Sequence, residues 1–251
     1  TPLYSSAASD VYKRQFLTMV QIDSPSKDER AMADWLKERF ESLGCKVVED
    51  DAGKAVGGNA GNLLVKLKGN RNAVEPLLFS SHMDTVEPAR GIVPVIEEGI
   101  VRSKGETILA ADDKAGLAVI LHLARMAKSQ PDVPRPDLEF SIHICEEIGL
   151  LGAKNVNTSQ FKSKIGFVLD DHDPQGICVG SPSAVRIDYK IVGRASHAGI
   201  EPEKGISAIE VAADAISKMT LGRIDYETTA NIGVIQGGRA SNVITEEVNL
   251  K

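Results

Sequence analysis

Aromatic residues are scarce in this chain of 251 residues: they make up 4% of it, against a hydrophobic share of 42%. A hydrophobic core must therefore be built mainly from Val, Ile, Leu and Ala. No apolar run approaches the ~20 residues that a membrane-spanning helix needs. No Lys- and Arg-rich run accompanies the net charge of -6. We therefore expect an ordinary globular protein that has neither a membrane nor nucleic acid as its partner.

Cysteine is also rare, with three residues, Cys45, Cys145 and Cys178. Their number is odd and their spacing wide, which favours reduced thiols over a disulfide framework and predicts a cytoplasmic protein. A charged and then apolar leader is missing as well. Residues 1–15 (TPLYSSAASDVYKRQ) have no helical or strand period, and we expect them to be a non-native leader outside the fold.

From residue 16 onward, short apolar strands alternate with helices. Ser26 and Glu29 have the spacing of a capping box for a helix that ends at Gly44, and residues 115–127 form a second, strongly apolar helix. The expected strands are 46–49, 62–67, 76–80, 138–144 and 165–169. This alternation predicts an α/β domain with a mostly parallel sheet and helices on both faces.

The pattern changes near residue 181. Strands at 184–192, 230–235 and 243–250, with a helix at 205–219, predict a second, α+β unit. We therefore expect a first domain over 16–181 and a second over 182–251.

Four short acidic clusters follow the apolar runs. They lie at residues 81–84 (SHMD), 111–114 (ADDK), 145–147 (CEE) and 169–171 (LDD). Ligands of open α/β sheets bind outside the carboxyl ends of the strands, where all four clusters are expected to lie. One His and several carboxylates suit a hard or borderline divalent metal ion. The set predicts a metal-dependent hydrolase.

Each cluster also has a simpler interpretation when it is considered alone. His82 and Asp84 would share a face of an extended segment, where Asp84 could hold the imidazole in one tautomer. Asp112 and Asp113 precede an apolar helix, so one of them could be its N-cap. Two adjacent carboxylates at a helix N-terminus also suit a metal bridge, because the helix dipole favours negative charge there.

Glu146 and Glu147 follow a strand directly and could form a solvated turn. Alternatively, one binds a metal and the other transfers a proton, and Asp170 with Asp171 has the same ambiguity. A glycosidase built on Glu146 and Asp170 is conceivable, but it leaves His82 unexplained and has few aromatic residues for a sugar platform. Four such clusters at four strand ends favour the metal site.

The remaining histidines favour structural interpretations. His122 lies within the apolar helix and His143 within a strand, so packing is the expected role of both. His172 lies in a polar run (DDHDP) and is expected in an exposed loop.

These motifs also resemble a known family. The runs SHMDTV, ADDKAG, EEIGLLGAK and VLDD resemble the aminoacylase/carboxypeptidase G family of di-zinc metallopeptidases, and within it the peptidase T-like, tripeptide aminopeptidase branch. The runs RASHAG (194–199) and GGRASN (237–242) match as well, so the resemblance covers residues 16–251. It implies a zinc-exopeptidase-type mixed sheet flanked by helices, with an inserted, ferredoxin-like lid domain that is incomplete here.

The resemblance also implies roles for residues of the first domain. His82, Asp112 and Asp170 would bind one zinc ion, and Asp112 would bridge to a second zinc ion held also by Glu147. Asp84 would orient His82. Glu146 would be the general base that deprotonates a water molecule between the two metal ions, which then attacks a peptide carbonyl. Two Zn²⁺ ions per complete subunit are expected, with Co²⁺ or Mn²⁺ as alternatives.

In the lid domain, the resemblance implies that His197 reaches across a homodimer to stabilise the oxyanion, and that Asn242 binds substrate. The family places a final metal-binding His after the lid, and no His follows His197 here. We therefore expect this chain to be a fragment that stops before that ligand, with impaired activity.

The expected function is hydrolysis of short peptides by an aminopeptidase acting on tripeptides. A related amidohydrolase, of aminoacylase, dipeptidase or carboxypeptidase type, is the alternative from the same class. A non-catalytic metal-binding or dimerisation module is the alternative from another class, although such a module has no need of a base at Glu146.

Overall fold

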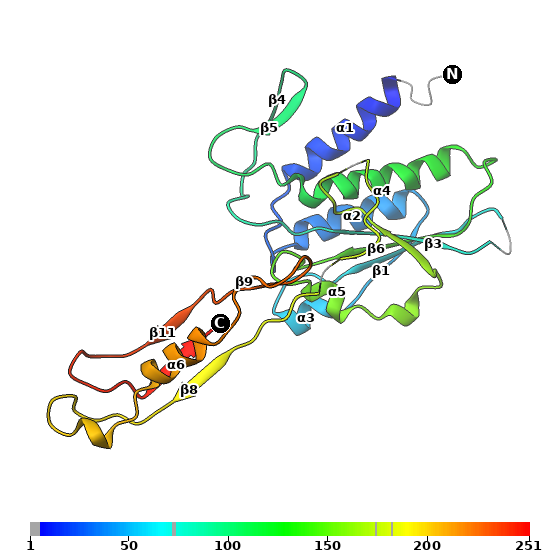
Figure 1. Cartoon of the computed structure of the whole chain (residues 1–251). Helices are drawn as coiled ribbons and strands as arrows, with labels where there is room; N and C mark the ends of the chain where they lie inside the picture. The colour runs from blue at the N-terminus through cyan, green and yellow to red at the C-terminus, as the bar shows by residue number, and fades with distance from the viewer. Residues whose placement is uncertain (1–5, 72–73, 174, 182) are drawn as a thin grey trace. The chain divides into compact units, whose positions relative to one another are not determined.

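The computed structural model describes residues 6–71, 74–173, 175–181 and 183–251, which belong to two compact units, Thr1–Pro174 and Gln175–Lys251 (Figure 1). Each unit has its own hydrophobic core. No helix within these described ranges is both long and apolar enough to cross a bilayer.

The first unit is built on a five-stranded sheet. In spatial order its strands are β1 (Lys46–Glu49), β2 (Leu63–Leu67), β6 (Leu138–His143), β3 (Leu77–His82) and β7 (Ile165–Val168). The pairs β1–β2 and β2–β6 are antiparallel, whereas β6–β3 and β3–β7 are parallel. This confirms the mixed sheet of the expected fold class and corrects the expectation of a mostly parallel sheet. The helix between β1 and β2, α3 (Ala52–Val56), has 5 residues and is too short to run back along the sheet as a parallel crossover requires.

Helices cover both faces of this sheet. The long helices α1 (Ser6–Val20), α2 (Arg30–Ser42) and α4 (Ala111–Ser129) lie on one face, and the short helices α3 and α5 (Leu151–Asn155) lie on the other (Figure 1). The buried side chains of α2 recur at helical spacing, Met32, Leu36 and Phe40, and therefore form one apolar stripe. Phe40 stacks on Phe140 of β6 with 5.7 Å between ring centroids, which joins helix and sheet.

Two further elements complete the first unit. A hairpin pairs β4 (Pro94–Glu97) with β5 (Ile100–Ser103), and a 3₁₀ turn, η1, spans Thr158–Gln160. The sequence pattern did not predict this hairpin, because no strict alternation of apolar and polar residues marks it.

Two expectations about the N-terminal region are wrong. Residues 6–15 are helical and continuous with 16–20 in α1, and Tyr12 packs edge-on against His122 with 6.2 Å between ring centroids. Residues 1–5 lie outside the described residues, and a non-native origin for the leader stays a prediction. The helix after Ser26 begins at Arg30 without a side-chain capping bond, so Ser26 and Glu29 are not a capping box.

The second unit is a small α+β structure. Its antiparallel sheet has the order β11 (Ile235–Gly237), β12 (Glu247–Leu250) and β8 (Tyr189–Val192). Helix α6 (Ala208–Ser217) packs on it through Ala208 and Ala212, which meet Val248 and Leu250. The oxygen of Ser207 caps this helix by accepting the Glu210 N–H.

The remaining elements of this unit are a 3₁₀ turn, η2 (Pro202–Lys204), and an antiparallel pair of β9 (Gly222–Arg223) and β10 (Thr229–Ala230). The strand expected at 230–235 is therefore wrong. β10 ends at Ala230, β11 begins at Ile235, and the residues between them belong to no strand, although the N–H groups of Gly233 and Val234 donate to the Lys251 carbonyl.

Candidate metal centre

Most of the predicted site residues of the first unit meet because the central strands are parallel, whereas Asp112 comes from the start of α4. β3 lies between β6 and β7, and in this register His82 at the end of β3 is opposite His143 at the end of β6. Pairing continues beyond the strands, since Leu169 N donates to the Ser80 carbonyl and Met83 N to the His143 carbonyl. The segments that follow β3, β6 and β7 therefore emerge side by side at one edge of the sheet.

Three of the predicted metal ligands come together at this edge. The Nε2 atom of His82 lies 3.1 Å from Oδ1 of Asp112 and 3.9 Å from Oδ2 of Asp170. One ligand atom from each of the three residues lies within 4.8 Å of the others. Glu147 is outside this group of three.

His82 is held in the tautomer that a metal ligand needs. Its ring is buried, and Nδ1 lies 2.9 Å from the backbone carbonyl oxygen of Asp84 and 3.3 Å from the Asp84 carboxylate. Nδ1–H donates to these acceptors, so Nε2 is the ring nitrogen that faces Asp112 and Asp170 and is the one placed to bind a metal ion.

The adjacent carboxylates Asp112 and Asp113 point to different places, one toward His82 and the other toward the N-terminus of α4. Oδ1 of Asp113 accepts the Gly116 N–H at 2.9 Å, as a helix-capping residue does, and its carboxyl is buried. Burial raises the pKa of Asp113 to about 7. The Asp112 side chain is 69% exposed and is the one that faces His82.

Glu146 and Glu147 belong to a tight turn of residues 144–152, here called the acid turn. Two backbone hydrogen bonds join its ends: Leu151 N donates to the Cys145 carbonyl at 3.0 Å, and Gly152 N donates to the Ile144 carbonyl at 3.1 Å. The backbone N–H groups of Glu146 and Glu147 donate to the Asp84 carboxylate, at 2.9 and 3.2 Å. Asp84 therefore joins the imidazole of His82 to the acid turn.

The electrostatics of this edge favour a bound cation. Burial raises the pKa of the carboxyls of Glu146, Glu147 and Asp170, and neighbouring carboxylates raise it further against the opposing effect of His82. Burial alone would lower the pKa of His82, but its hydrogen bond to Asp84 and the surrounding carboxylates raise it to about 10. Because the carboxylates repel one another, a divalent cation would relieve the excess negative charge. The donor set of one imidazole nitrogen and several carboxylate oxygens fits a zinc-like ion.

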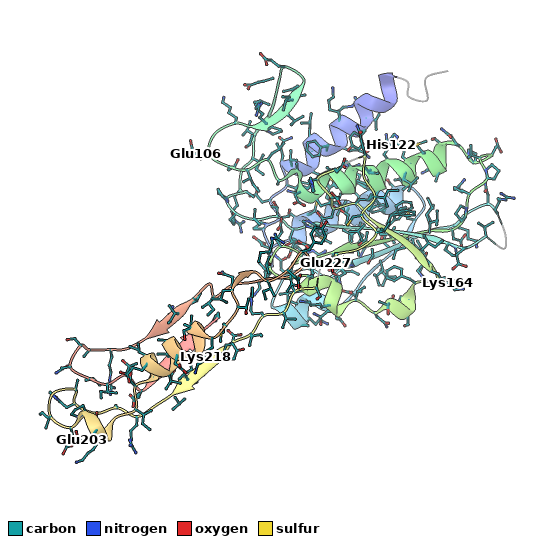
Figure 2. All side chains as sticks on the ribbon, in the orientation of Figure 1. Glu106, His122, Lys164, Glu203, Lys218 and Glu227 are labelled. Atoms are coloured by element: carbon teal, nitrogen blue, oxygen red, sulfur yellow. The ribbon has the colours of Figure 1, made fainter. Side chains whose placement is uncertain are left out.

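The other histidines of the first unit lie as expected. His143 Nε2 is 2.8 Å from the Ser141 hydroxyl, and burial lowers its pKa to about 4. His122 lies on α4 beside α1 (Figure 2). The His172 side chain is fully exposed, 3.2 Å from Asp171.

The sequence reasoning missed three polar residues that support the site. Ser26 Oγ donates to Asp84 Oδ2 at 2.7 Å, and the fully buried Glu29 accepts the Cys145 N–H at 3.1 Å. Asn62 is also fully buried and accepts the Ile144 N–H while donating to the Gly152 carbonyl. For Ser26 and Glu29 the sequence carried a misleading signal, because their spacing is that of a capping box.

In the second unit, the predicted substrate-binding residues lie on paired segments. His197 forms an isolated β-bridge with Val243, and Ala198 N donates to the Asn242 carbonyl at 3.0 Å. Both His197 and Asn242 are exposed. Nδ1 of His197 accepts the Gly199 N–H at 3.2 Å, so a neutral ring carries its proton on Nε2.

Two family profiles match the chain. Residues 62–171 match peptidase family M28, and residues 179–251 match the peptidase dimerisation domain. The first range contains the whole cluster around His82, and the second contains His197 and Asn242.

Individual relatives match over nearly the whole chain. An uncharacterized protein, YqjE, of Bacillus subtilis (strain 168) is 46% identical over 237 residues, which are 94% of this chain and 63% of the relative. The crystal structure of aminopeptidase PepT from Bacillus cereus ATCC 10987 superposes with a TM-score of 0.83 at 40% identity, covering 96% of this chain and 65% of that one. A tripeptidase from Staphylococcus aureus subsp. aureus Mu50 gives a TM-score of 0.81 at 38% identity, covering 95% and 64%. The chain thus spans slightly less than two thirds of these relatives.

The mixed sheet and the acidic edge after its central strands define the class as a peptidase-type α/β fold with a dimerisation domain. Within that class, the chain is similar to aminopeptidase PepT and to a tripeptidase, and its second unit matches the M20 type of dimerisation domain. This confirms the resemblance and the fold class expected from the motifs.

Proposed function

We propose that the complete protein is a metal-dependent exopeptidase that releases the N-terminal residue of short peptides, with tripeptides as its preferred substrates. The observation that carries this proposal is the convergence of His82, Asp112 and Asp170 beside a turn that presents Glu146. Similarity to an aminopeptidase and a tripeptidase supports the choice of substrate.

In this proposal, His82, Asp112 and Asp170 hold one zinc ion, and Asp112 and Glu147 contribute to a second, with Co²⁺ or Mn²⁺ as alternative metals. When bound, such ions supply Lewis acidity, which polarises a carbonyl and makes a nucleophile available from water near neutral pH. Asp84 keeps the Nε2 lone pair of His82 directed at the site through the contacts of Nδ1.

Glu146 is the proposed general base. It takes a proton from the attacking water and then returns it to the leaving amine. The raised pKa of its carboxyl, caused by burial and by nearby Asp170 and Asp84 against the effect of His82, suits a group that must hold a proton during part of the cycle. His197 of the second unit would reach across the proposed homodimer and donate from Nε2 to the charge that develops on the carbonyl oxygen in the neighbouring subunit's site, and Asn242 would bind the substrate.

Chelator-sensitive release of the N-terminal residue from a tripeptide by the complete protein tests this proposal. Glu146→Gln should lower kcat at least about 100-fold, the low end of what a general base contributes, while metal binding is retained. Asp171→Asn is the matched control, because Asp171 adjoins Asp170 but lies outside the metal-binding group. An unchanged rate in Glu146→Gln would refute the role of the base.

The same assay separates the alternatives. Preferential hydrolysis of an N-acyl amino acid, a dipeptide or a C-terminal residue would assign the protein to a related amidohydrolase activity. Metal binding without any turnover in the complete protein would instead support a non-catalytic module.

The accompanying properties are part of the same proposal. We infer a homodimer formed through residues 182–251, whose match to a peptidase dimerisation domain supports it. A cytoplasmic location and a division into domains at residues 181 and 182 complete the proposed description.

A further inference from the structure

We propose that Glu29 is a positioning residue of the metal centre, because its buried carboxylate fixes the acid turn so that Glu146 and Glu147 face the site. This inference rests on the proposed function, since it assigns Glu29 a role in the same site. Glu29 acts through the backbone of Cys145 and contacts neither the metal-binding group nor a substrate.

The contacts of Glu29 converge on the start of the acid turn. Its side chain is fully buried, and Oε1 accepts the Cys145 N–H at 3.1 Å and the Cys145 thiol at 3.3 Å. The same oxygen accepts the Lys27 N–H at 2.9 Å, which fixes the carboxylate relative to its own loop. Cys145 has a φ of 50°, in the left-handed region that a residue with a Cβ seldom adopts. A bond from its N–H is therefore well placed to hold that conformation.

Three buried side chains anchor the acid turn, and of these only Glu29 acts on the residue directly before Glu146. Asn62 holds the base of the turn at Ile144 and Gly152. Asp84 holds the N–H groups of Glu146 and Glu147 but also contacts His82. A change at Asp84 therefore disturbs the ligand and the turn together, whereas a change at Glu29 disturbs the turn and the loop at Lys27 but no predicted metal ligand.

The chain offers a matched control in Glu139. This residue is 3% exposed, and its Oε2 accepts the N–H groups of Lys162 and Ser163 and the Ser163 hydroxyl at 2.7–2.9 Å. It is the second residue of β6, at the end of that strand opposite the acid turn. Each of the two buried glutamates therefore has one oxygen that accepts from three donors, and only the donors to Glu29 include the acid turn. The other oxygen of Glu139 also pairs with Lys66 at 3.1 Å.

The test compares Glu29→Leu, Glu29→Gln, Glu29→Asp and Glu139→Leu in the complete protein. Co²⁺ affinity and kcat and KM for a tripeptide are measured on the folded fraction of each variant. Loss of an outer-shell partner typically lowers metal affinity or activity about 10- to 100-fold, and we expect a loss of this size in Co²⁺ affinity and kcat for Glu29→Leu, with little change in KM. Glu29→Gln keeps the acceptor oxygen and should remain within about threefold of the unmodified protein, a change well below that range.

Glu29→Asp keeps the charge but draws the carboxylate back from Cys145, so we expect it to behave like Glu29→Leu. It also provides the test if Glu29→Leu does not fold. Glu139→Leu should lose stability while the folded fraction keeps its Co²⁺ affinity and kcat. Equal effects of Glu29→Leu and Glu139→Leu on Co²⁺ affinity would overturn the inference, as would a Glu29→Gln variant as impaired as Glu29→Leu.

The same measurements distinguish failure of the proposed peptidase activity from failure of the role assigned to Glu29. If the unmodified protein binds Co²⁺ but cleaves no peptide, the proposed activity fails, and the Co²⁺ affinities of the variants still decide the role of Glu29.

Discussion

Replacing Asp84 by Asn perturbs the one carboxylate that joins the imidazole ligand to the acid turn. Oδ1 accepts the Glu146 N–H at 2.9 Å and lies 3.3 Å from Nδ1 of His82, and Oδ2 accepts the Ser26 hydroxyl at 2.7 Å and the Glu147 N–H at 3.2 Å. The side chain is fully buried, so water cannot replace a lost partner.

The structure determines which of these bonds the amide of Asp84→Asn can keep. With its oxygen at the position of Oδ1, the amide would still accept from Glu146 and His82, and the Ser26 hydroxyl could turn to accept from the new NH₂ group. The Glu147 N–H would then face a donor. One unsatisfied donor near a buried site costs about 1–3 kcal/mol, so we expect Asp84→Asn to lower the free energy of unfolding by about 2 kcal/mol. Asp84→Ala loses all four contacts and should lower it by about 4 kcal/mol.

Trp35 provides the assay, because it is the only tryptophan of the chain and lies on α2 of the first unit. Urea unfolding of the metal-free protein at pH 7, followed by Trp35 fluorescence, gives the free energies for each variant. Asp137→Asn is the control, since Asp137 accepts from Gly69 and Lys68 just before β6, at the opposite end of that strand. A loss below about 0.5 kcal/mol for Asp84→Asn, the range of ordinary surface substitutions, would refute the reasoning.

Three further predictions concern the same unit. Gly152→Ala would place a Cβ 2.3 Å from the Ile144 carbonyl oxygen and should lower the free energy of unfolding in urea by about 1–3 kcal/mol. Gly166→Ala should cost less, because the nearest atoms to its Cβ are side-chain atoms of Leu78, from 3.5 Å. Equal costs for the two variants would contradict this prediction. Burial raises the pKa of Glu139, but hydrogen bonds from Ser163, Lys162 and Lys66 outweigh this effect and hold the pKa below its ordinary value of 4.5. The Glu139 carboxylate therefore stabilises the fold above pH 4.5, and this stabilisation is lost as the pH falls through the pKa of the folded state. The stability difference between the unmodified protein and Glu139→Gln should therefore shrink in acid, and a difference that grows would contradict the sign. Zn²⁺ at about 100 times its dissociation constant should add about 2.7 kcal/mol to the free energy of unfolding, and a chelator should reverse this increase. In Asp112→Asn at the same zinc concentration the increase should be about 1.4 kcal/mol or less.

Much of the first unit followed from its sequence because its central strands are apolar runs with clear ends. β1 lies at residues 46–49 as predicted, and β6 differs from its predicted range by one residue. The antiparallel placement of β2 was not predicted, because it follows from the five-residue helix α3, which is too short for a parallel crossover and has no clear signal in the sequence. The helical conformation of residues 6–15 depends on α1 packing against α4, which the local pattern does not reveal.

Some residues of the candidate site were likewise predictable from the sequence, and others were not. His82 and Asp170 were predictable as neighbours, because they lie at the carboxyl ends of the neighbouring parallel strands β3 and β7. Asp112 comes instead from the start of α4, so the expectation that its cluster follows a strand of the sheet is wrong. Ser26 and Glu29 were not predictable, since their partners lie 58 and 116 residues away in the chain. A Ser and a Glu three residues apart before an apolar helix have the pattern of a helix cap, and only the tertiary fold directs them to Asp84 and Cys145 instead.

A Co²⁺ titration is the most direct measurement of whether His82, Asp112 and Asp170 form a metal site. The protein, Asp112→Asn and Asp171→Asn are titrated side by side, with absorption in the visible range as the readout. We expect saturable binding that Asp112→Asn abolishes or weakens at least about tenfold and that Asp171→Asn leaves unchanged. Absence of saturable binding, or an equal loss in both variants, would contradict this expectation.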